Sequence, residues 1–237
     1  MKRQSTPELL DTDSGTPAEI AATLADLHFV NRRFGGIATT EAMIRRVASV
    51  SGSRSLSLLE VAAGSGNMSK MIEGRMRAQG VELRLSLLDR ISSHMHKAGN
   101  GNGHSVPKNG VHAVAGDALA LPFRDESFDL VSCNLFVHHL SPVQAVQFVN
   151  EALRTARIAV LVNDLVRHRL HLALVLAGLP LFRSRMTWHD GPASVRQAYT
   201  VQEMRRLFDR TNAALVEIER RYLFRMGAIA WKSACRS

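Results

Sequence analysis

The stretch LSLLEVAAGSGN, residues 56–67, decides the fold of this chain. An apolar run ends at Glu60 and Val61, and small residues with glycines at 64 and 66 follow it. This pattern predicts a buried strand, a tight turn and a helix start, and glycine lets a backbone approach a nucleotide-like ligand because it has no Cβ. Ser69 stands where a dinucleotide-binding turn has its third glycine, and no Gly-Lys-Ser/Thr of a phosphate loop follows. Glu60 would repel a pyrophosphate but suits a cationic ligand such as an ammonium or a sulfonium.

Length and composition predict one domain. The chain has 237 residues, 46% of them apolar, which is enough for one full-sized core but cramped for two. No apolar run reaches the roughly 18 residues of a membrane span, and the polar start does not resemble a signal peptide, so we expect a cytoplasmic protein. Cys133 and Cys235 have neither metal-ligand spacing nor a disulfide framework, so we expect free thiols and no metal. The net charge of +9 would suit a nucleic-acid partner, but the basic residues are scattered, so none is expected.

The chain before the first strand divides into a tail and a helical cap. Residues 1–17 are polar and lack apolar periodicity, so we expect a disordered tail. Residues 18–237 are expected to form a single domain that begins with a helical cap over 18–54. Apolar residues at helical spacing predict a first helix that ends at a glycine pair, and Thr39 or Thr40 is expected to cap a second helix.

From Ser55 onward, strand-like and helix-like segments alternate. This alternation is typical of an α/β fold with a mostly parallel sheet and helices on both faces. The last two of seven expected strands are nearly contiguous, and a tight connection joins only antiparallel neighbours, so the sheet should end in a hairpin. The expected strands are 56–61, 83–88, 111–115, 128–134, 157–164, 214–222 and 224–232. The expected helices between them are 67–79, 90–97, 141–155 and 200–211.

Two insertions interrupt the alternation. Residues 99–110 are rich in glycine and asparagine, so we expect a surface loop. Residues 167–199 are mostly apolar and contain helix breakers at Gly178, Pro180 and Pro192. We expect this second insertion to fold over the strand ends as a substrate lid.

Polar residues stand at the carboxyl ends of four expected strands, where open parallel sheets bind ligands. Glu60 ends the first strand, Asp89 the second and Asn134 the fourth, and Gly116-Asp117-Ala118 follows the third. A carboxylate at Asp89 can accept both hydroxyls of a ribose, and the turn at 116–118 can contact an adenine amino edge. Asp89 alone could be a helix cap and residues 116–117 an ordinary turn, but their joint occurrence favours a ligand site.

Three stretches together resemble the class I S-adenosylmethionine-dependent methyltransferases: EVAAGSG at 60–66, LLD at 87–89 and GDALALPFRDESFD at 116–129. The third stretch is especially similar to the ubiquinone/menaquinone-biosynthesis type of small-molecule methyltransferase. The resemblance extends over about residues 55–165. It implies a Rossmann-like fold with a seven-stranded sheet and S-adenosylmethionine as the cofactor.

The resemblance also implies the cofactor contacts. Glu60 and the glycine turn would hold the methionine part, Asp89 the ribose, and Asp117 with its neighbour the adenine, while Asn134 would lie close to the sulfonium. Ala62 stands where the family usually has glycine, so the backbone there should be less permissive, although alanine is small enough for binding to survive. The expected cofactor-binding residues are Glu60, Ala62, Gly64, Gly66, Asp89, Arg90, Asp117, Ala118 and Asn134.

Methyl transfer is an in-line displacement, so the protein mainly has to align both reactants, exclude water and, for an oxygen or nitrogen nucleophile, remove a proton. His138 and His139 follow the fourth strand and are the candidate catalytic residues, as base or substrate ligand, although both could instead fix local structure. Asn163-Asp164 has the same rim position and could orient substrate, unless Asp164 pairs with a nearby arginine. At His189-Asp190 we expect a loop turn.

The apolar insertion favours a small apolar or aromatic acceptor, quinone-like or polyketide-like, methylated on oxygen or carbon. Two other functions stay open. The charge favours a nucleic-acid (RNA) methyltransferase, but NLFV at 134–137 replaces the Asn/Asp-Pro-Pro-aromatic stretch typical of base-amine methylation. The second alternative is a non-catalytic, cofactor-binding accessory protein. We expect a monomer or a homodimer.

Overall fold

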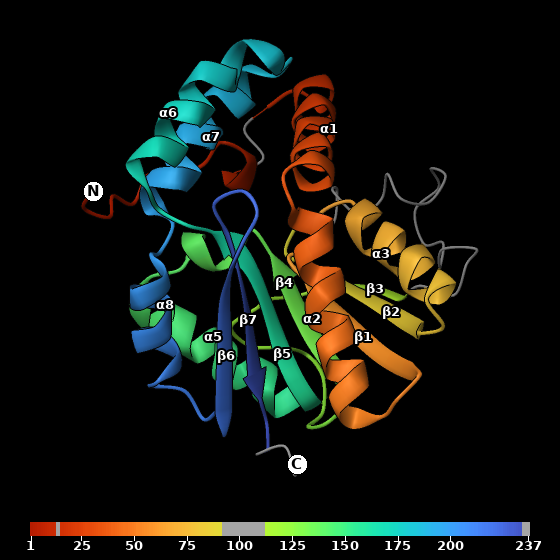
Figure 1. Ribbon diagram of the computed structural model, residues 1–237. Helices are drawn as coiled ribbons and strands as arrows, with labels where there is room; N and C mark the ends of the chain where they lie inside the picture. The colour runs from red at the N-terminus through yellow and green to blue at the C-terminus, as the bar shows by residue number, and fades with distance from the viewer. Residues whose placement is uncertain (13–14, 92–111, 234–237) are drawn as a thin grey trace.

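A seven-stranded sheet forms the centre of the computed structural model, which describes residues 1–12, 15–91 and 112–233 (Figure 1). The strand order is β3-β2-β1-β4-β5-β7-β6. The strands are β1 (Ser55–Val61), β2 (Glu82–Asp89), β3 (His112–Ala115), β4 (Phe128–Asn134), β5 (Ala156–Leu165), β6 (Leu215–Arg221) and β7 (Arg225–Trp231). All pairs from β3 to β5 are parallel, and β7 is antiparallel to both β5 and β6. The predicted strands, parallel sheet and terminal hairpin are confirmed.

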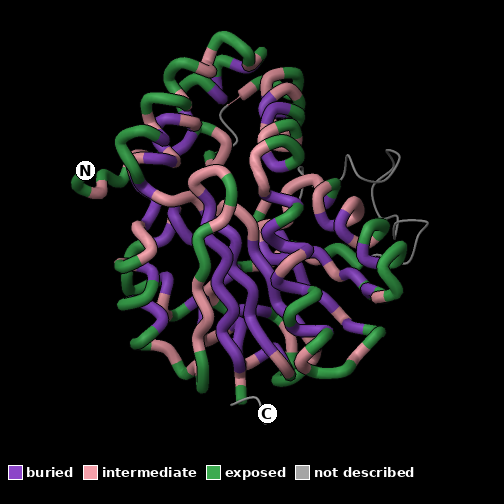
Figure 2. The backbone as a smooth tube through the Cα atoms, viewed as in Figure 1, coloured by how far each residue is buried: buried purple, intermediate pink, exposed green. Residues whose placement is uncertain are grey.

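Helices cover both faces of this sheet, as expected. α2 (Gly36–Ser51) and α3 (Asn67–Ala78) pack on one face, and α5 (Pro142–Thr155) and α8 (Val201–Phe208) pack on the other. Within β1, Leu56 and Leu58 belong to the core under α2 and α3, whereas Leu59 and Val61 belong to the core under α5. Because both faces are covered, the middle of the sheet is buried throughout, as Figure 2 shows, and its strands appear in the sequence as apolar runs.

Three further helices lie beyond the carboxyl ends of the parallel strands. They are α1 (Pro17–Arg33), α6 (Arg169–Gly178) and α7 (Arg185–Gln197), at the top of Figure 1. The insertion 167–199 thus forms α6, α7 and the short 3-10 helix Leu179–Leu181 between them. Of its expected helix breakers, Gly178 ends α6, whereas Pro192 lies inside α7 and does not break it.

The predicted cap of the second helix is wrong, and the predictions for residues 90–110 fall largely outside the described residues. α2 begins at Gly36 and its N-cap is Gly35, in a left-handed conformation with φ 77°, so the predicted cap at Thr39 or Thr40 is wrong. A Cβ at Gly35 would lie 1.8 Å from the carbonyl oxygen of Tyr222, so only glycine fits there. The expected loop at 99–110 and most of the expected helix at 90–97 lie outside the described residues.

Residues 1–12 differ from the expected disordered tail because polar groups tie this segment to α7. The N–H of Gln4 donates to the Arg196 carbonyl, and the Asp190 carboxylate accepts from the N–H groups of Leu9 and Leu10 at 2.8 and 3.1 Å. Asp190 lies inside α7, so the loop turn predicted at His189-Asp190 is wrong. Hydrogen bonds therefore position this segment, and such bonds produce no apolar periodicity in the sequence.

No helix in the part of the chain that the structure describes is long and apolar enough to cross a membrane.

Candidate functional site

A cavity of about 650 Å³ lies at the carboxyl ends of the strands, beneath α1, α6 and α7. It opens where the strand order reverses between β1 and β4, the usual ligand position in an open parallel sheet. Eight of the nine expected cofactor-binding residues line it, and only Gly66 does not. The candidate catalytic residues His138 and His139 line the same cavity.

The turn after β1 is built from alternate left-handed residues. Ala62, Gly64 and Gly66 have φ values of 55°, 53° and 67°. The N–H of Ala63 donates to the Leu88 carbonyl at 3.1 Å, which fixes the turn against the end of β2. A Cβ at Gly66 would lie 2.4 Å from a Leu87 methyl group, so Gly66 lets the turn pack closely against β2. Ala62 occupies a conformation that glycine adopts without cost, as its departure from the family pattern suggested.

Asp89 joins the first two strand ends. Its Oδ2 accepts from the Gly64 N–H at 2.7 Å, and its Oδ1 accepts from the Ile91 N–H at 2.9 Å. Each oxygen keeps a further lone pair for a ligand in the cavity. Next to it, Asp117 accepts from the Leu119 N–H at 2.9 Å and remains exposed, while Arg90 donates to the Asp11 carbonyl at 3.3 Å.

Glu60 is a buried carboxyl group at the floor of the cavity. It accepts hydrogen bonds from the Ser132 hydroxyl and, at 2.6 Å, from the Asn134 amide, whose own oxygen accepts from Thr40 at 2.7 Å. Burial raises the pKa of Glu60 to about 7, and the bonds from Ser132 and Asn134 only partly oppose this. No ion pair to Glu60 occurs among the described residues, so the site holds a carboxyl group ready for a cation.

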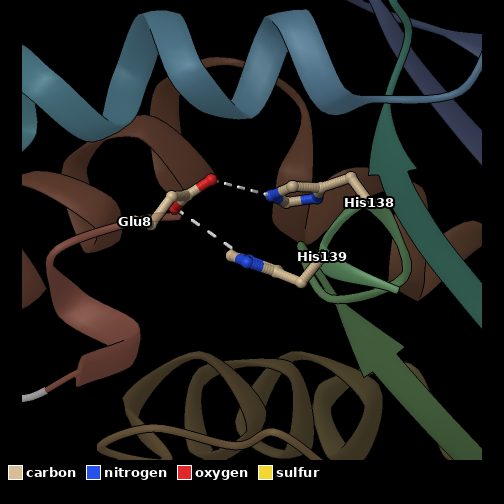
Figure 3. A group of neighbouring side chains, drawn as sticks. All are labelled: Glu8, His138 and His139. Carbon is tan, nitrogen blue, oxygen red and sulfur yellow. Dashed lines mark ion pairs between the residues drawn. The ribbon is translucent and has the colours of Figure 1, made fainter. Parts of the chain in front are cut away.

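His138 lies between two carboxylates, of which Figure 3 shows Glu8. Its Nδ1 is 2.6 Å from Asp164 Oδ1, and its Nε2 is 3.5 Å from Glu8 Oε1. Burial alone would lower the pKa of His138, but the charge and hydrogen bond of Asp164, followed by those of Glu8, raise it to about 10. Burial likewise would raise the pKa values of Glu8 and Asp164, yet His138 holds both below their usual range. In this arrangement His138 is therefore a cation at neutral pH.

His139 is partly exposed on the same wall. Its Nδ1 lies 2.8 Å from Asp11 Oδ2, in a direction that makes no hydrogen bond, and its Nε2 is 4.0 Å from Glu8 Oε2. The two histidine rings lie 4.1 Å apart between centroids. Both carboxylates come from the segment that was expected to be disordered.

The comparisons with known proteins agree with this architecture. A family model described as a methyltransferase domain matches residues 59–159. The plantazolicin methyltransferase BpumL, in complex with a monoazolic desmethylPZN analog and SAH, superposes with a TM-score of 0.62 at 12% identity, over 88% of this chain and 89% of that one. An O-methyltransferase family 2 protein from Planctomyces limnophilus, in complex with apigenin, gives 0.59 at 16% identity over 92% and 62%. A SAM-dependent methyltransferase from Methanosarcina mazei gives 0.53 at 16% identity over 76% and 94%.

Residues 59–159 match the methyltransferase-domain family, and the fold of the chain is that of the class I S-adenosylmethionine-dependent methyltransferases. At these identities the solved structures show the fold, and the family model carries the assignment. No curated protein matches the methyltransferase significantly. Its cofactor is S-adenosylmethionine. The buried Glu60 carboxyl group, with no cation beside it among the described residues, and the open turn at 62–66 fit a cofactor that carries an ammonium and a sulfonium.

The roof of the methyltransferase cavity combines apolar and polar side chains from α1 and from the insertion. The polar ones include Asp26, Thr187 and Ser194. The apolar ones include Leu24, Leu27, Val175, Leu179, Phe182 and Val195. Other apolar residues of the insertion, including Leu174, Leu176 and Leu181, are exposed, so only part of its apolar surface faces the cavity.

Sequence reasoning missed the groups that hold the site together. Asp164 pairs with His138, whereas Arg167 pairs with Glu203 at 2.6 Å. Asn163 is fully buried and donates to the Gly36 carbonyl at 2.7 Å, so neither residue 163 nor 164 lines the cavity. Glu8 gave no signal, because a lone acidic residue in a polar tail has no pattern that indicates burial.

Proposed function

We propose that the methyltransferase transfers the methyl group of S-adenosylmethionine to oxygen or carbon of a small apolar or aromatic acceptor that binds beneath the roof. The observation that carries this proposal is a single cavity with two unlike ends. Carboxylates line it at the strand ends, and aliphatic side chains and Phe182 line it beneath α1 and the insertion. Cavities of this size, mostly apolar with a few placed polar groups, are typical of small-molecule sites.

We assign the cofactor end to the eight expected residues that line the cavity, with Gly66 shaping the turn behind them. Asp89 has carboxylate lone pairs free for ribose hydroxyls, and its position is fixed by the Gly64 and Ile91 N–H groups. Glu60 offers negative charge to the ammonium or sulfonium, and the exposed Asp117 carboxylate is available to the adenine amino group. Arg90 is the weakest of the eight because its guanidinium contacts the N-terminal segment.

The acceptor end aligns the nucleophile and excludes water. When bound, S-adenosylmethionine supplies a methyl group on a positively charged sulfur. α1, α6 and α7 cover the strand ends, so an acceptor beneath them is shielded from solvent. His138 already carries a proton between Asp164 and Glu8, which suits binding of an acceptor oxygen, and His139 is the candidate for removing a hydroxyl proton.

Two solved structures support this acceptor class at the level of fold. The Planctomyces limnophilus structure holds apigenin, and the plantazolicin methyltransferase holds a substrate analog together with SAH.

The test is a panel of acceptors with release of S-adenosylhomocysteine as the readout. We expect turnover with phenols, hydroquinones and similar aromatic compounds, and Phe182→Ala should raise the acceptor KM about 5- to 50-fold, because a buried aromatic contact is lost. Leu181→Ala is the matched control, since Leu181 adjoins Phe182 but is 76% exposed and outside the cavity.

Three other results would overturn the proposal. Turnover only with very polar acceptors would exclude an apolar acceptor site. Turnover only with RNA, falling steeply as salt rises, would favour the nucleic-acid alternative. Cofactor binding without turnover across phenols, hydroquinones, carbon acids and RNA would favour the accessory protein.

A further inference from the structure

We propose that Glu8, His138 and His139 bind one divalent transition-metal cation, with Zn²⁺ as the reference ion. Each of these residues offers one ligand atom, and the three atoms lie within 4.8 Å of one another (Figure 3). Two imidazole nitrogens and one carboxylate oxygen are a ligand set that Zn²⁺ and Fe²⁺ accept, whereas Mg²⁺ and Ca²⁺ prefer oxygen alone. No spacing pattern indicates such a site, because Glu8 lies about 130 residues before the histidines.

The orientation of both rings favours metal binding. The Nε2 atoms of the two histidines are the ones near Glu8, at 3.5 and 4.0 Å from its oxygens. Their Nδ1 atoms lie beside carboxylates, Asp164 for His138 and Asp11 for His139. The hydrogen bond between Nδ1 of His138 and Asp164 fixes the tautomer in which Nε2 binds a metal, and metal-bound histidines in proteins usually have such a partner. Asp11 lies beside Nδ1 of His139 without a hydrogen bond to it.

The surroundings of the buried Nε2 atom of His138 also favour a metal ion. His138 is only 2% exposed, and among the described residues its Nε2 has the Glu8 carboxylate beside it at 3.5 Å, outside good hydrogen-bond geometry. A buried polar atom so far from its acceptor is poorly satisfied, and a cation between Nε2 and Glu8 would satisfy both. The separations also suit an ion, because ligands at about 2.1 Å around a tetrahedral centre lie about 3.4 Å apart. Shifts of about 1 Å or less would close this site around a cation.

The charge and the surroundings of the three residues suit a cation as well. Glu8, Asp11 and Asp164 bring three carboxylates around two imidazoles. The Glu8 carboxylate is held in place by Gln197 and by Ser194, each donating to Oε1 at 2.6 Å. All three proposed ligands line the cavity, so a bound cation would keep a coordination position open toward it. An open position beside three protein ligands is typical of catalytic rather than structural zinc sites.

The role of the cation rests on the proposed function. At the open position it would bind the hydroxyl oxygen of an acceptor and lower the pKa of that hydroxyl. In this metal-bound state His139 would be a ligand and not the base, and the hydroxyl proton would leave to solvent. The oxygen then forms its bond to the methyl carbon while the carbon–sulfur bond breaks, and the bonding pair stays on sulfur as a neutral thioether.

The experiment measures metal binding directly, on full-length protein without a polyhistidine tag. After dialysis against a chelator, the protein is titrated with Zn²⁺ by calorimetry and with Co²⁺ by visible absorption. We expect one ion per chain with micromolar or tighter affinity, and d–d bands of a four- or five-coordinate nitrogen–oxygen site. Glu8→Gln and His139→Ala should each weaken binding at least about tenfold, and the exposed His112→Ala, at the far end of β3, should leave it unchanged.

Two results would overturn the metal site. One is a wild-type protein that takes up neither ion, which would leave His138 as a protonated group between carboxylates. The other is binding that Glu8→Gln and His139→Ala leave unchanged. S-adenosylmethionine affinity of the metal-free protein, measured in the same cell, keeps this test separate from the proposed function. Intact cofactor affinity with no metal uptake rejects the metal alone, and lost cofactor affinity rejects the cofactor site.

Discussion

Oδ2 of Asp89, at the end of β2, accepts a 2.7 Å hydrogen bond from the N–H of Gly64 in the turn after β1. One carboxylate therefore both shapes the turn and faces the cavity. We predict that Asp89→Ala weakens S-adenosylmethionine binding about 10- to 100-fold, because charge-assisted hydrogen bonds contribute about 1.5–3 kcal/mol. Calorimetric titration measures this effect. Glu82→Ala, at the exposed opposite end of the same strand, is the control, and equal affinities of the two variants would contradict the assignment.

Ala62 has φ 55°, where an L-residue is strained and glycine is not. We predict that Ala62→Gly raises the free energy of unfolding by up to about 1 kcal/mol, since the relief of strain exceeds the entropy that glycine loses on folding. Ala63→Gly is the matched control, because Ala63 is not left-handed and should lose about 0.5–1 kcal/mol. Urea unfolding measures both. A destabilised Ala62→Gly variant would show that the alanine Cβ makes a contact that outweighs its strain.

The strands were predictable because both faces of the sheet are covered. β1, β4 and β5 are buried over most of their length, so each appears in the sequence as a mostly apolar segment. The polar residues at the strand ends could be found for the same reason, since Glu60, Asp89 and Asn134 interrupt or end such runs. Strand direction then placed them at one rim before any contact was known.

The groups that connect distant segments were not predictable. Glu8 and Asp190 act through single hydrogen bonds and ion pairs, which leave no periodic pattern in the sequence. Thr40 has the residue type of a helix cap, but its hydroxyl donates to Asn134, while the backbone of Gly35 begins the helix. The charge on His138 depends on two carboxylates that meet only in the folded chain.

Arg225 is a buried cation that ties β7 to the helical cap. It donates to Asn31 at 2.7 Å, to Asn163 at 3.2 Å and to the Phe34 carbonyl at 3.2 Å, and burial lowers its pKa to about 10. We predict that Arg225→Met lowers the free energy of unfolding by about 3 kcal/mol or more, because three oxygens lose their donor. Arg220→Met, exposed on β6, should change it by less than about 0.5 kcal/mol. Denaturant unfolding followed by circular dichroism distinguishes them, and similar midpoints would reject this role.

Burial raises the pKa of Glu60 from 4.5 to about 7, so the folded, cofactor-free protein holds this proton more tightly than the unfolded chain. Its free energy of unfolding should therefore fall as pH rises from about 4.5 to about 7, by about 3 kcal/mol for this group. Glu60→Gln keeps the shape and removes the charge. We predict that the variant matches the wild type in stability at pH 5 and exceeds it at pH 8, in urea unfolding without cofactor.

The affinity for S-adenosylmethionine should change with pH in the opposite direction, through the same Glu60 carboxyl group. A cation near Glu60 favours the ionised carboxylate, so S-adenosylmethionine binding to the wild type should strengthen as pH rises through about 7. Glu60→Gln lacks this gain. The dissociation constant of the variant divided by that of the wild type should therefore be near one at pH 5 and about ten or more at pH 8. Comparing the two proteins cancels the titration of the cofactor and of all other groups. A ratio independent of pH would mean that Glu60 does not face the positive charge, and the methionine end of the cofactor would then have to be placed elsewhere along the rim.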